Sequence, residues 1–185
     1  IEAQMSVNGG APQSSRFRID VLAAPKTPAV GSPAIPSKNL TIKDTPDPSR
    51  LTSDGQPDLD LYQLTIADAI AAKKPFLLAF STPGFCQTAV CGPNLDVIKK
   101  LKGELKGQIN FLHVEVYMYP FAESAEQHKL VPTMQEWQLE SEPWTFLVDA
   151  QGIIRAKYEG GITFAEMEPA LKQLAAGQPI QPASA

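Results

Sequence analysis

Residues 142–158, EPWTFLVDAQGIIRAKY, contain the pattern that decides the fold. Two runs within this stretch, Trp144–Asp149 and Ile153–Tyr158, are rich in β-branched and aromatic residues, and the turn Asp149-Ala-Gln-Gly152 joins them. A Gly-containing turn between two such runs predicts a β-hairpin. Pro143 stands directly before the first strand of this hairpin.

Strands and helices alternate along the chain before this hairpin. Pro75–Ser81 is an apolar run that predicts a buried strand, and Gln108–Tyr117 predicts a second strand. Helical patterns precede, separate and follow these strands, over residues 65–73, 94–105, 123–138 and 164–176. Within 123–138, Pro132 must interrupt or start a helix. Strands that alternate with helices imply a parallel sheet, to which the hairpin adds an antiparallel edge. We therefore predict an α/β domain with a central mixed sheet flanked by helices.

The first 58 residues differ in composition from the rest. They are rich in Pro, Ser, Gly and Ala, which predicts an extended and largely irregular N-terminal extension. Arg16–Leu22 is an exception, because its apolar residues alternate with polar ones as in a half-buried strand. This strand would belong to an upstream β domain or add to the edge of this domain's own sheet. The predicted organisation is the extension over 1–58, the α/β domain over 59–177 and a disordered tail over 178–185.

Overall composition excludes several classes of function. A chain of 185 residues with 43% hydrophobic residues is long enough for one domain with a sizeable core. Its net charge of −4 provides no basic surface, so we expect no nucleic acid partner. No apolar run approaches the ~20 residues that cross a bilayer, so we expect no membrane span, although a tether in a longer protein is compatible with the sequence. The Pro-, Ala- and Ser-rich ends favour an extracytoplasmic location, either periplasmic or at the cell surface.

The two cysteines of the chain lie together in Phe85-Cys-Gln-Thr-Ala-Val-Cys-Gly-Pro93, between a predicted strand and a predicted helix. The backbone amides and the dipole at a helix start stabilise a thiolate, which is the reactive form of cysteine. This position predicts reversible thiol chemistry, with Cys86 as the attacking thiolate because it follows the strand and Cys91 as the resolving thiol. The alternative is a disulfide that only staples the loop, although closing so small a loop adds little stability.

The spacing of the cysteines limits how they can bond. Four residues separate them, and on a regular helix this separation gives a Cα distance of about 8.6 Å, beyond the ~7 Å limit for a disulfide. One solution is that the helix begins at Pro93, since Pro is favoured at the first helical position, and that both cysteines lie in a loop. The other is that the helix begins after Cys86 and unwinds locally when the pair oxidises.

The order of these elements resembles the thioredoxin-like superfamily of thiol–disulfide oxidoreductases. The resemblance covers roughly residues 60–176 and is carried by Phe80–Cys86, Glu142–Asp149, the Gly152 turn and Gly160-Gly161. It implies a thioredoxin-like fold, a cis-proline at Pro143 that faces the reactive cysteine, and a protein thiol or disulfide as the partner. Cys86, Cys91 and Pro143 are thus the predicted catalytic residues, and no cofactor or metal is expected.

Two neighbouring families suggest alternative functions for the CxxxxC pair. Thr82-Pro-Gly-Phe-Cys86 with Cys91 is similar to a motif of some peroxiredoxins, which implies a thiol peroxidase. The chain differs by the inserted Phe85, and by Ala79 and Pro83 where peroxiredoxins place a proline and a threonine.

Sco-type copper chaperones, which also resemble this chain, have three residues between their cysteines and a distant histidine. His113 and His128 do not stand in that motif, but a copper-binding or non-enzymatic structural module remains a second alternative. We predict His113 to be a partly buried histidine with satisfied hydrogen bonds and His128 to be an exposed helical residue.

The other charged and aromatic residues have structural interpretations. Trp137 and Trp144 are expected in the core or in the wall of a groove. The lysines of the predicted helix after the cysteines are expected on its solvated face; they are Lys99, Lys100, Lys102 and Lys106. Glu142 would either approach the cysteines and raise the pKa of a thiol or point into solvent.

Overall fold

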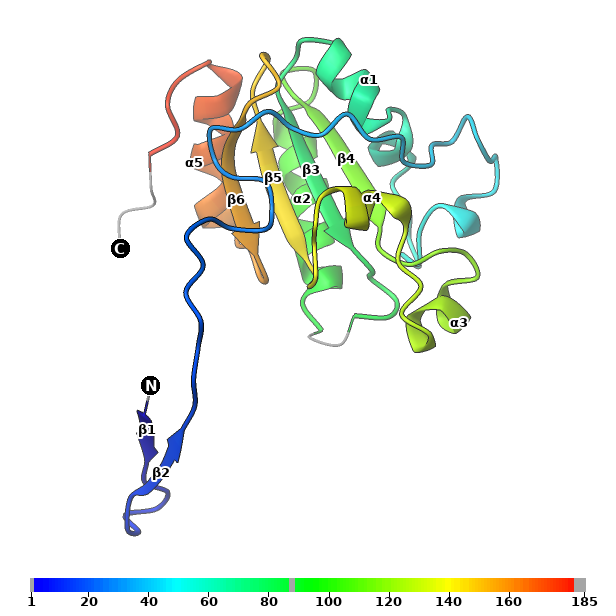
Figure 1. Ribbon diagram of the computed structural model, residues 1–185. Coiled ribbons are helices and arrows are strands. Elements are labelled where there is room, and N and C mark those ends of the chain that lie inside the picture. Colours follow the sequence, from blue (N-terminus) through cyan, green and yellow to red (C-terminus); the bar gives the residue numbers. More distant parts are fainter. Residues whose placement is uncertain (1, 87–88, 182–185) are drawn as a thin grey trace.

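The computed structural model describes residues 2–86 and 89–181 (Figure 1). Its sheet has four strands, β3 (Phe76–Ser81), β4 (Asn110–Glu115), β5 (Trp144–Val148) and β6 (Ile154–Glu159). Its helices are α1 (Ile66–Ala71), α2 (Cys91–Glu104), α3 (Phe121–Glu126), α4 (Pro132–Glu136) and α5 (Phe164–Ala175). Two strands, β1 (Glu2–Met5) and β2 (Gln13–Arg16), and two 3-10 helices, η1 (Pro48–Arg50) and η2 (Leu59–Tyr62), lie in the N-terminal part.

The central sheet has the strand order β4-β3-β5-β6. Strand β3 pairs parallel to β4 and antiparallel to β5, and β5 pairs antiparallel to β6 through the predicted hairpin. Gly152 makes the hairpin turn with a φ of +77°, a conformation that glycine adopts without steric cost. The prediction of a mixed sheet with an antiparallel edge is confirmed.

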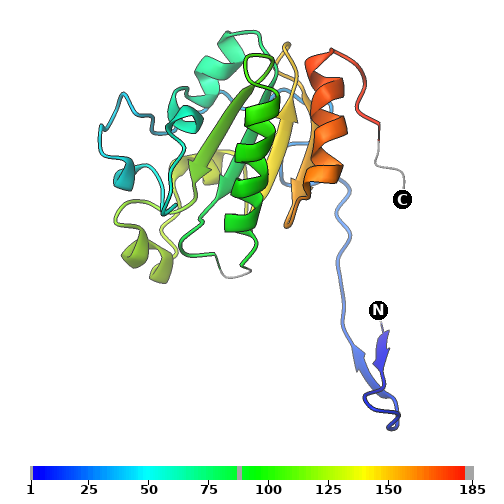
Figure 2. The ribbon, with the colours of Figure 1, turned by 180° about the vertical axis from the view of Figure 1, so that it is seen from behind.

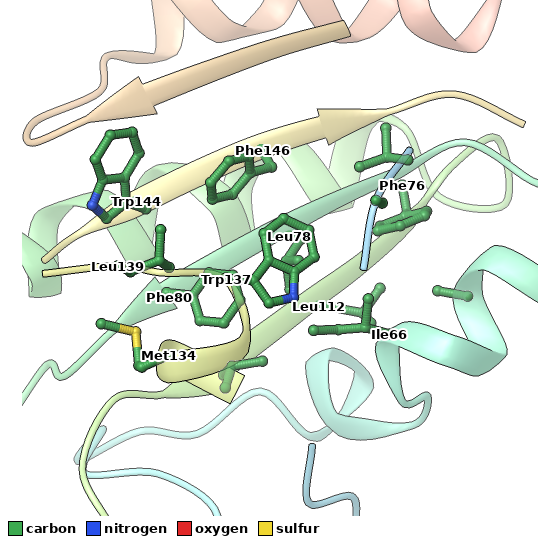
Figure 3. Packing of buried hydrophobic residues seen from close by; sticks show 14 of the residues in the cluster. Ile66, Phe76, Leu78, Phe80, Leu112, Met134, Trp137, Leu139, Trp144 and Phe146 are labelled. Carbon is green, nitrogen blue, oxygen red and sulfur yellow. The ribbon is translucent and has the colours of Figure 1, made fainter. Parts of the chain in front are cut away.

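Helices cover both faces of the sheet. Figure 2 shows α2 and α5 side by side on one face, where their apolar residues pack against Leu77, Ala79 and Leu147. Helices α1 and α4 lie on the other face. There, Trp137 is fully buried and packs against Phe80 and Phe146, with ring centroids 5.4 and 4.8 Å away (Figure 3). Both tryptophans are core residues, as predicted, because Trp144 is also buried.

The helix-prone segment over 123–138 is two short helices, α3 and α4, with the interruption that Pro132 predicts. His128, between them, has a φ of +50°, and Pro132 is the first residue of α4. Pro is favoured at that position and lacks the N–H that a helix interior needs, so the chain cannot continue as one helix through it. His128 is exposed as predicted, but it lies in a turn instead of a helix.

The start of the N-terminal extension stands away from the rest of the molecule (Figure 1). Strands β1 and β2 pair with each other as an antiparallel hairpin, and all of their residues are exposed. The prediction of a half-buried strand over Arg16–Leu22 is therefore wrong: β2 ends at Arg16, and Val21 is 89% exposed. These residues add no strand to the edge of the central sheet, where the described neighbours of β4 and β6 are β3 and β5.

The rest of the extension lies against the domain. From Gly31 onward its backbone pairs with the hairpin, as in the bond from the Gly31 N–H to the Ile154 carbonyl at 2.8 Å. Side chains along this segment are buried, including Ala34, Asn39, Thr41, Leu51 and Thr52. We call residues 33–58 the strap. The strap is irregular, as predicted, but it forms part of the core.

The C-terminal residues extend past α5. Ile180 is partly buried against the α5 side of the core, and the Gln181 N–H donates to the Gln173 side chain at 2.9 Å. The rest of the predicted disordered tail, residues 182–185, lies outside the described residues. No helix in the described ranges is both long and apolar enough to cross a membrane.

Candidate functional site

The two cysteines form a disulfide at the start of α2. Their Cα atoms lie 5.9 Å apart, within the range that a disulfide spans. Cys91 is the first residue of α2, whereas Cys86 lies in the turn that leads from β3. Neither helix start considered from the sequence is correct, since α2 begins at Cys91 and not at Pro93 or directly after Cys86. Of the two cysteines only Cys91 is helical, and their Cα distance is shorter than the ~8.6 Å that a regular helix from Cys86 to Cys91 would give.

The two cysteine residues differ in their access to solvent. Cys91 is fully buried, whereas Cys86 is half-buried, and the adjacent Phe85 is 37% exposed. The Cys91 backbone N–H donates to the Cys86 sulfur at 3.4 Å, which is the kind of contact that stabilises negative charge on sulfur at a helix start. A partner molecule can therefore reach Cys86 more easily than Cys91.

A carboxyl group lies next to Cys91. The Oε2 atom of Glu142 is 3.8 Å from the Cys91 sulfur. Glu142 is half-buried, and the peptide bond that joins it to Pro143 is cis. Burial, and secondarily the charge of Glu115, raise the pKa of the Glu142 carboxyl to about 7. Of the two orientations considered for Glu142, the structure has the one beside the cysteines.

The strap supports the turn that contains Cys86. The Ser53 hydroxyl accepts a hydrogen bond from the Gly84 N–H at 3.0 Å and donates to the Glu115 carboxyl at 2.8 Å. The Ser53 backbone N–H also donates to this carboxyl, at 2.7 Å. A Cβ atom on Gly84 would lie 2.9 Å from the Ser53 carbonyl oxygen, so only glycine allows this close approach. Burial raises the pKa of Glu115, whose side chain is 5% exposed.

A family model described as a thioredoxin-like domain matches residues 62–175. The chain belongs to the thioredoxin-like family. The match includes both cysteines, Glu142 and Pro143, while the strap precedes it. No curated protein matches the sequence.

Solved structures are similar to this thioredoxin-like chain at low sequence identity. An uncharacterised conserved protein from Geobacillus kaustophilus is 14% identical with a TM-score of 0.51, covering 83% of this chain and 85% of its own. A thiol:disulfide interchange protein from Chlorobium tepidum is 14% identical with a TM-score of 0.47, and the match covers 83% of this chain and 99% of that protein. An exposed lipoprotein thioredoxin from Streptococcus pneumoniae is 15% identical with a TM-score of 0.40, and the match covers 57% of this chain and 90% of that protein. At this identity the first of these supports the fold alone.

The surroundings of His113 in the thioredoxin-like domain indicate a structural role. It is 1% exposed, which is deeper than the partial burial predicted for it. Its Nε2 atom lies 3.1 Å from the Ser81 carbonyl, which can only accept, so Nε2 carries the proton and Nδ1 accepts from the Tyr62 hydroxyl at 2.7 Å. Burial lowers the pKa of His113 to about 4. With both ring nitrogens engaged, His113 has no free position for a copper ion.

Two of the four lysines predicted to be solvated bind the strap instead. The Lys99 ammonium lies 2.6 Å from the Asp54 carboxylate, and Lys102 pairs with Asp58 and Asp60 at 2.8 and 2.6 Å. The side chains of Lys99 and Lys102 are only 21% and 17% exposed. These pairs connect the strap and the adjoining η2 to α2, which carries Cys91.

Glu115 and Ser53 were missed as supports of the site. A signal for Glu115 was present, since it is an ionisable residue within the strongly apolar run Phe111–Tyr117. A buried carboxyl in a strand needs hydrogen-bond donors, but sequence alone does not say which donors supply them. Ser53 carries no comparable signal, because it lies in a segment of ordinary loop composition.

Proposed function

We propose that this thioredoxin-like domain is a thiol–disulfide oxidoreductase that exchanges disulfides through Cys86 and Cys91. The observation that carries the proposal is the asymmetry of the pair, with a partly exposed cysteine before the helix and a buried cysteine at the helix start. An exchange enzyme needs one cysteine that a partner can reach and a second that only the first can reach.

The exchange would begin when the Cys86 thiolate attacks a disulfide of a partner protein. An S–S bond forms between Cys86 and one partner sulfur, the partner disulfide breaks, and the leaving thiolate takes a proton from solvent. Phe85 offers the partner an apolar contact beside Cys86, and Pro143 follows Glu142 at the edge of the site. The product of this step is a mixed disulfide.

The second step would release the partner. The Cys91 thiol loses its proton and its thiolate attacks the Cys86 sulfur, so that the Cys86–Cys91 bond forms and the second partner sulfur leaves as a thiolate. Glu142 is the carboxylate placed to accept the Cys91 proton, at 3.8 Å from the sulfur. Overall, the partner disulfide gains two electrons and the domain's dithiol loses two.

We also propose that the domain works outside the cytoplasm. A disulfide of this kind persists in oxidising compartments, and the Pro-, Ala- and Ser-rich ends are typical of secreted or surface proteins. Trapping of free thiols in the host, followed by fractionation, measures both the location and the resting oxidation state. A chain found only in the cytoplasm would contradict this part of the proposal.

The exchange activity is tested by equilibrating the chain with glutathione or dithiothreitol buffers and trapping free thiols. We expect a reversible two-electron transition of the pair. With a model disulfide substrate, Cys91→Ser should accumulate the mixed disulfide on Cys86, whereas Cys86→Ser should form none. A pair that stays oxidised in strong reductant, or a Cys86 thiol that does not react, would refute the proposal in favour of a structural staple.

A further inference from the structure

The site that carries the disulfide also gathers three metal-ligating side chains. The ligand atoms of Cys86, Cys91 and Glu142 all lie within 4.8 Å of one another, and no other group of His, Cys, Asp and Glu does so within residues 2–86 and 89–181. We propose that the reduced domain binds one Zn²⁺ through the two thiolates and the Glu142 carboxylate. The proposal rests on the proposed function only in requiring that the pair can be reduced.

The distances suit a tetrahedral zinc centre. A sulfur and an oxygen that share a tetrahedral Zn²⁺ are separated by about 3.5 Å, given bond lengths near 2.3 and 2.0 Å. The Cys91 sulfur and Glu142 Oε2 are already 3.8 Å apart. Two thiolates on the same ion lie about 3.8 Å apart, so the two sulfurs must separate when the disulfide is reduced. Small side-chain rotations of Cys86, which lies in a turn, can provide this separation.

The kinds of ligand select the metal. Two thiolates and one carboxylate form a mixed soft and hard set, which suits Zn²⁺ better than Cu(I), since Cu(I) prefers sulfur ligands alone. Three protein ligands leave the fourth tetrahedral position to solvent. The site therefore resembles open zinc sites in ligand number and differs from closed structural sites, which have four protein ligands.

A second layer of contacts holds the Glu142 carboxyl in place. The backbone of Thr82, which directly follows β3, favours the charged form of this carboxyl, and the Thr82 hydroxyl lies 3.3 Å from that of Ser53. Contacts of this kind orient a ligand before the metal arrives and raise the affinity of the site. Cys91 is the first residue of α2, and Glu142 lies in the bend that precedes β5.

Metal binding would compete with disulfide exchange. The disulfide is first reduced by two electrons from a thiol reductant, and Zn²⁺ then displaces the two thiol protons into solvent as two Zn–S bonds form. Zinc-bound thiolates are not free to attack a partner disulfide. Because only the reduced form binds the ion, Zn²⁺ also shifts the pair towards the dithiol. The same three side chains would thus serve exchange in the absence of zinc and metal storage or inhibition in its presence.

The test is a zinc titration of the full chain, reduced with a phosphine under anaerobic conditions and monitored by competition with a chromophoric chelator. We expect one Zn²⁺ per reduced chain and none for the oxidised chain. Glu142→Gln should weaken the affinity about 10-fold or more, since it replaces a ligand with a neutral amide. Titration with Co²⁺ should give the intense absorption of tetrahedral thiolate coordination, and Cys91→Ser should lose most of it.

Two variants serve as matched controls. Glu140→Gln removes a neighbouring carboxylate that is 75% exposed and paired with Lys26, and it should leave the affinity unchanged. His128→Ala removes an exposed histidine that lies outside the proposed ligand set, and it should also leave the affinity unchanged. Equal affinity of the reduced and oxidised chains, or of wild type and Glu142→Gln, would overturn the proposal. A normal redox transition in metal-free buffer would show that such a failure concerns the zinc site and not the exchange activity.

Discussion

The two parts of the N-terminal extension were predicted together as one irregular segment, but they have opposite structures. Residues 2–22 form an exposed hairpin and a solvated segment, whereas the strap over 33–58 is bound to both faces of the thioredoxin-like domain. The difference lies in partners: the Ser37 hydroxyl accepts from the Trp137 indole at 3.1 Å, and the Asn39 side chain accepts from the Ile66 N–H at 2.8 Å. A Pro- and Ser-rich segment thus becomes part of a domain when its polar side chains form hydrogen bonds with polar groups of that domain.

Removing the two parts separately should give the largest difference in the free energy of unfolding. A chain that begins at residue 25 should unfold at the same urea concentration as the full chain, because residues 2–22 bury nothing. A chain that begins at residue 59 should lose about 5 kcal/mol or fail to fold, since several apolar strap residues and the partners of Trp137 and Glu115 are lost together. Urea unfolding followed by tryptophan fluorescence measures both. Equal loss from the two truncations would show that the strap is not part of the core.

Substituting one leucine in each part tests the same difference in stability with a smaller expected effect. Leu51 in the strap is 4% exposed and packs with Leu61, Tyr62 and the α2 face, so Leu51→Ala should cost about 2–4 kcal/mol. Leu22 is 59% exposed, and Leu22→Ala should change the free energy of unfolding by less than about 0.5 kcal/mol. Urea midpoints of the two variants should therefore differ clearly, and indistinguishable midpoints would contradict the docked position of the strap.

Acid should destabilise the domain against which the strap packs, because His113 is buried there in its neutral form. The folded pKa of this residue is about 4 and its unfolded pKa is near 6.5, so the unfolded chain binds a proton that the folded chain excludes. This contribution is complete above pH 6.5 and is lost as the pH falls from there towards 4. Between pH 8 and pH 5 the loss should be about 2 kcal/mol. The measurement is urea unfolding at each pH.

An NMR titration identifies the source of that loss. The imidazole signals of His113 should stay those of the neutral ring from pH 8 down to about pH 5. The β1–β2 hairpin should contribute little to the pH dependence, because the Arg16–Glu2 pair is solvent-exposed and exposed pairs contribute little. A titration midpoint for His113 near 6.5 would contradict its buried environment.

The local features of this fold were predictable from the sequence, and its long-range contacts were not. The hairpin after Pro143, the buried strand before Ser81 and the cysteine pair are each read from adjacent residues, because pattern and turn chemistry act over short distances. The start of α2 at Cys91 was missed because the turn before it depends on Ala89, whose φ of +56° no sequence rule predicts for alanine. The strap was missed for a different reason, because its partners lie far along the chain.

Ser53 illustrates that second kind of failure. Its hydroxyl joins Gly84, which precedes Cys86 by two residues, to Glu115, which is 62 positions away from Ser53 in the sequence. Nothing in the local sequence distinguishes Ser53 from Ser15 of β2, which is exposed. The buried carboxyl of Glu115 could be recognised as needing donors, but its donors could be named only from the folded chain.

The smallest predicted effect separates these two serines. Ser53→Ala removes the acceptor of the Gly84 N–H and one donor to the buried Glu115 carboxyl, and it should cost about 1–2 kcal/mol. Ser15→Ala should be neutral within about 0.5 kcal/mol. The effect of Ser53→Ala should also be local: hydrogen exchange of the Gly84 amide should accelerate more than that of amides in β3 and β5, because this amide loses its partner directly. If all amides accelerated equally, Ser53 would stabilise the domain as a whole and would not specifically hold the turn before Cys86.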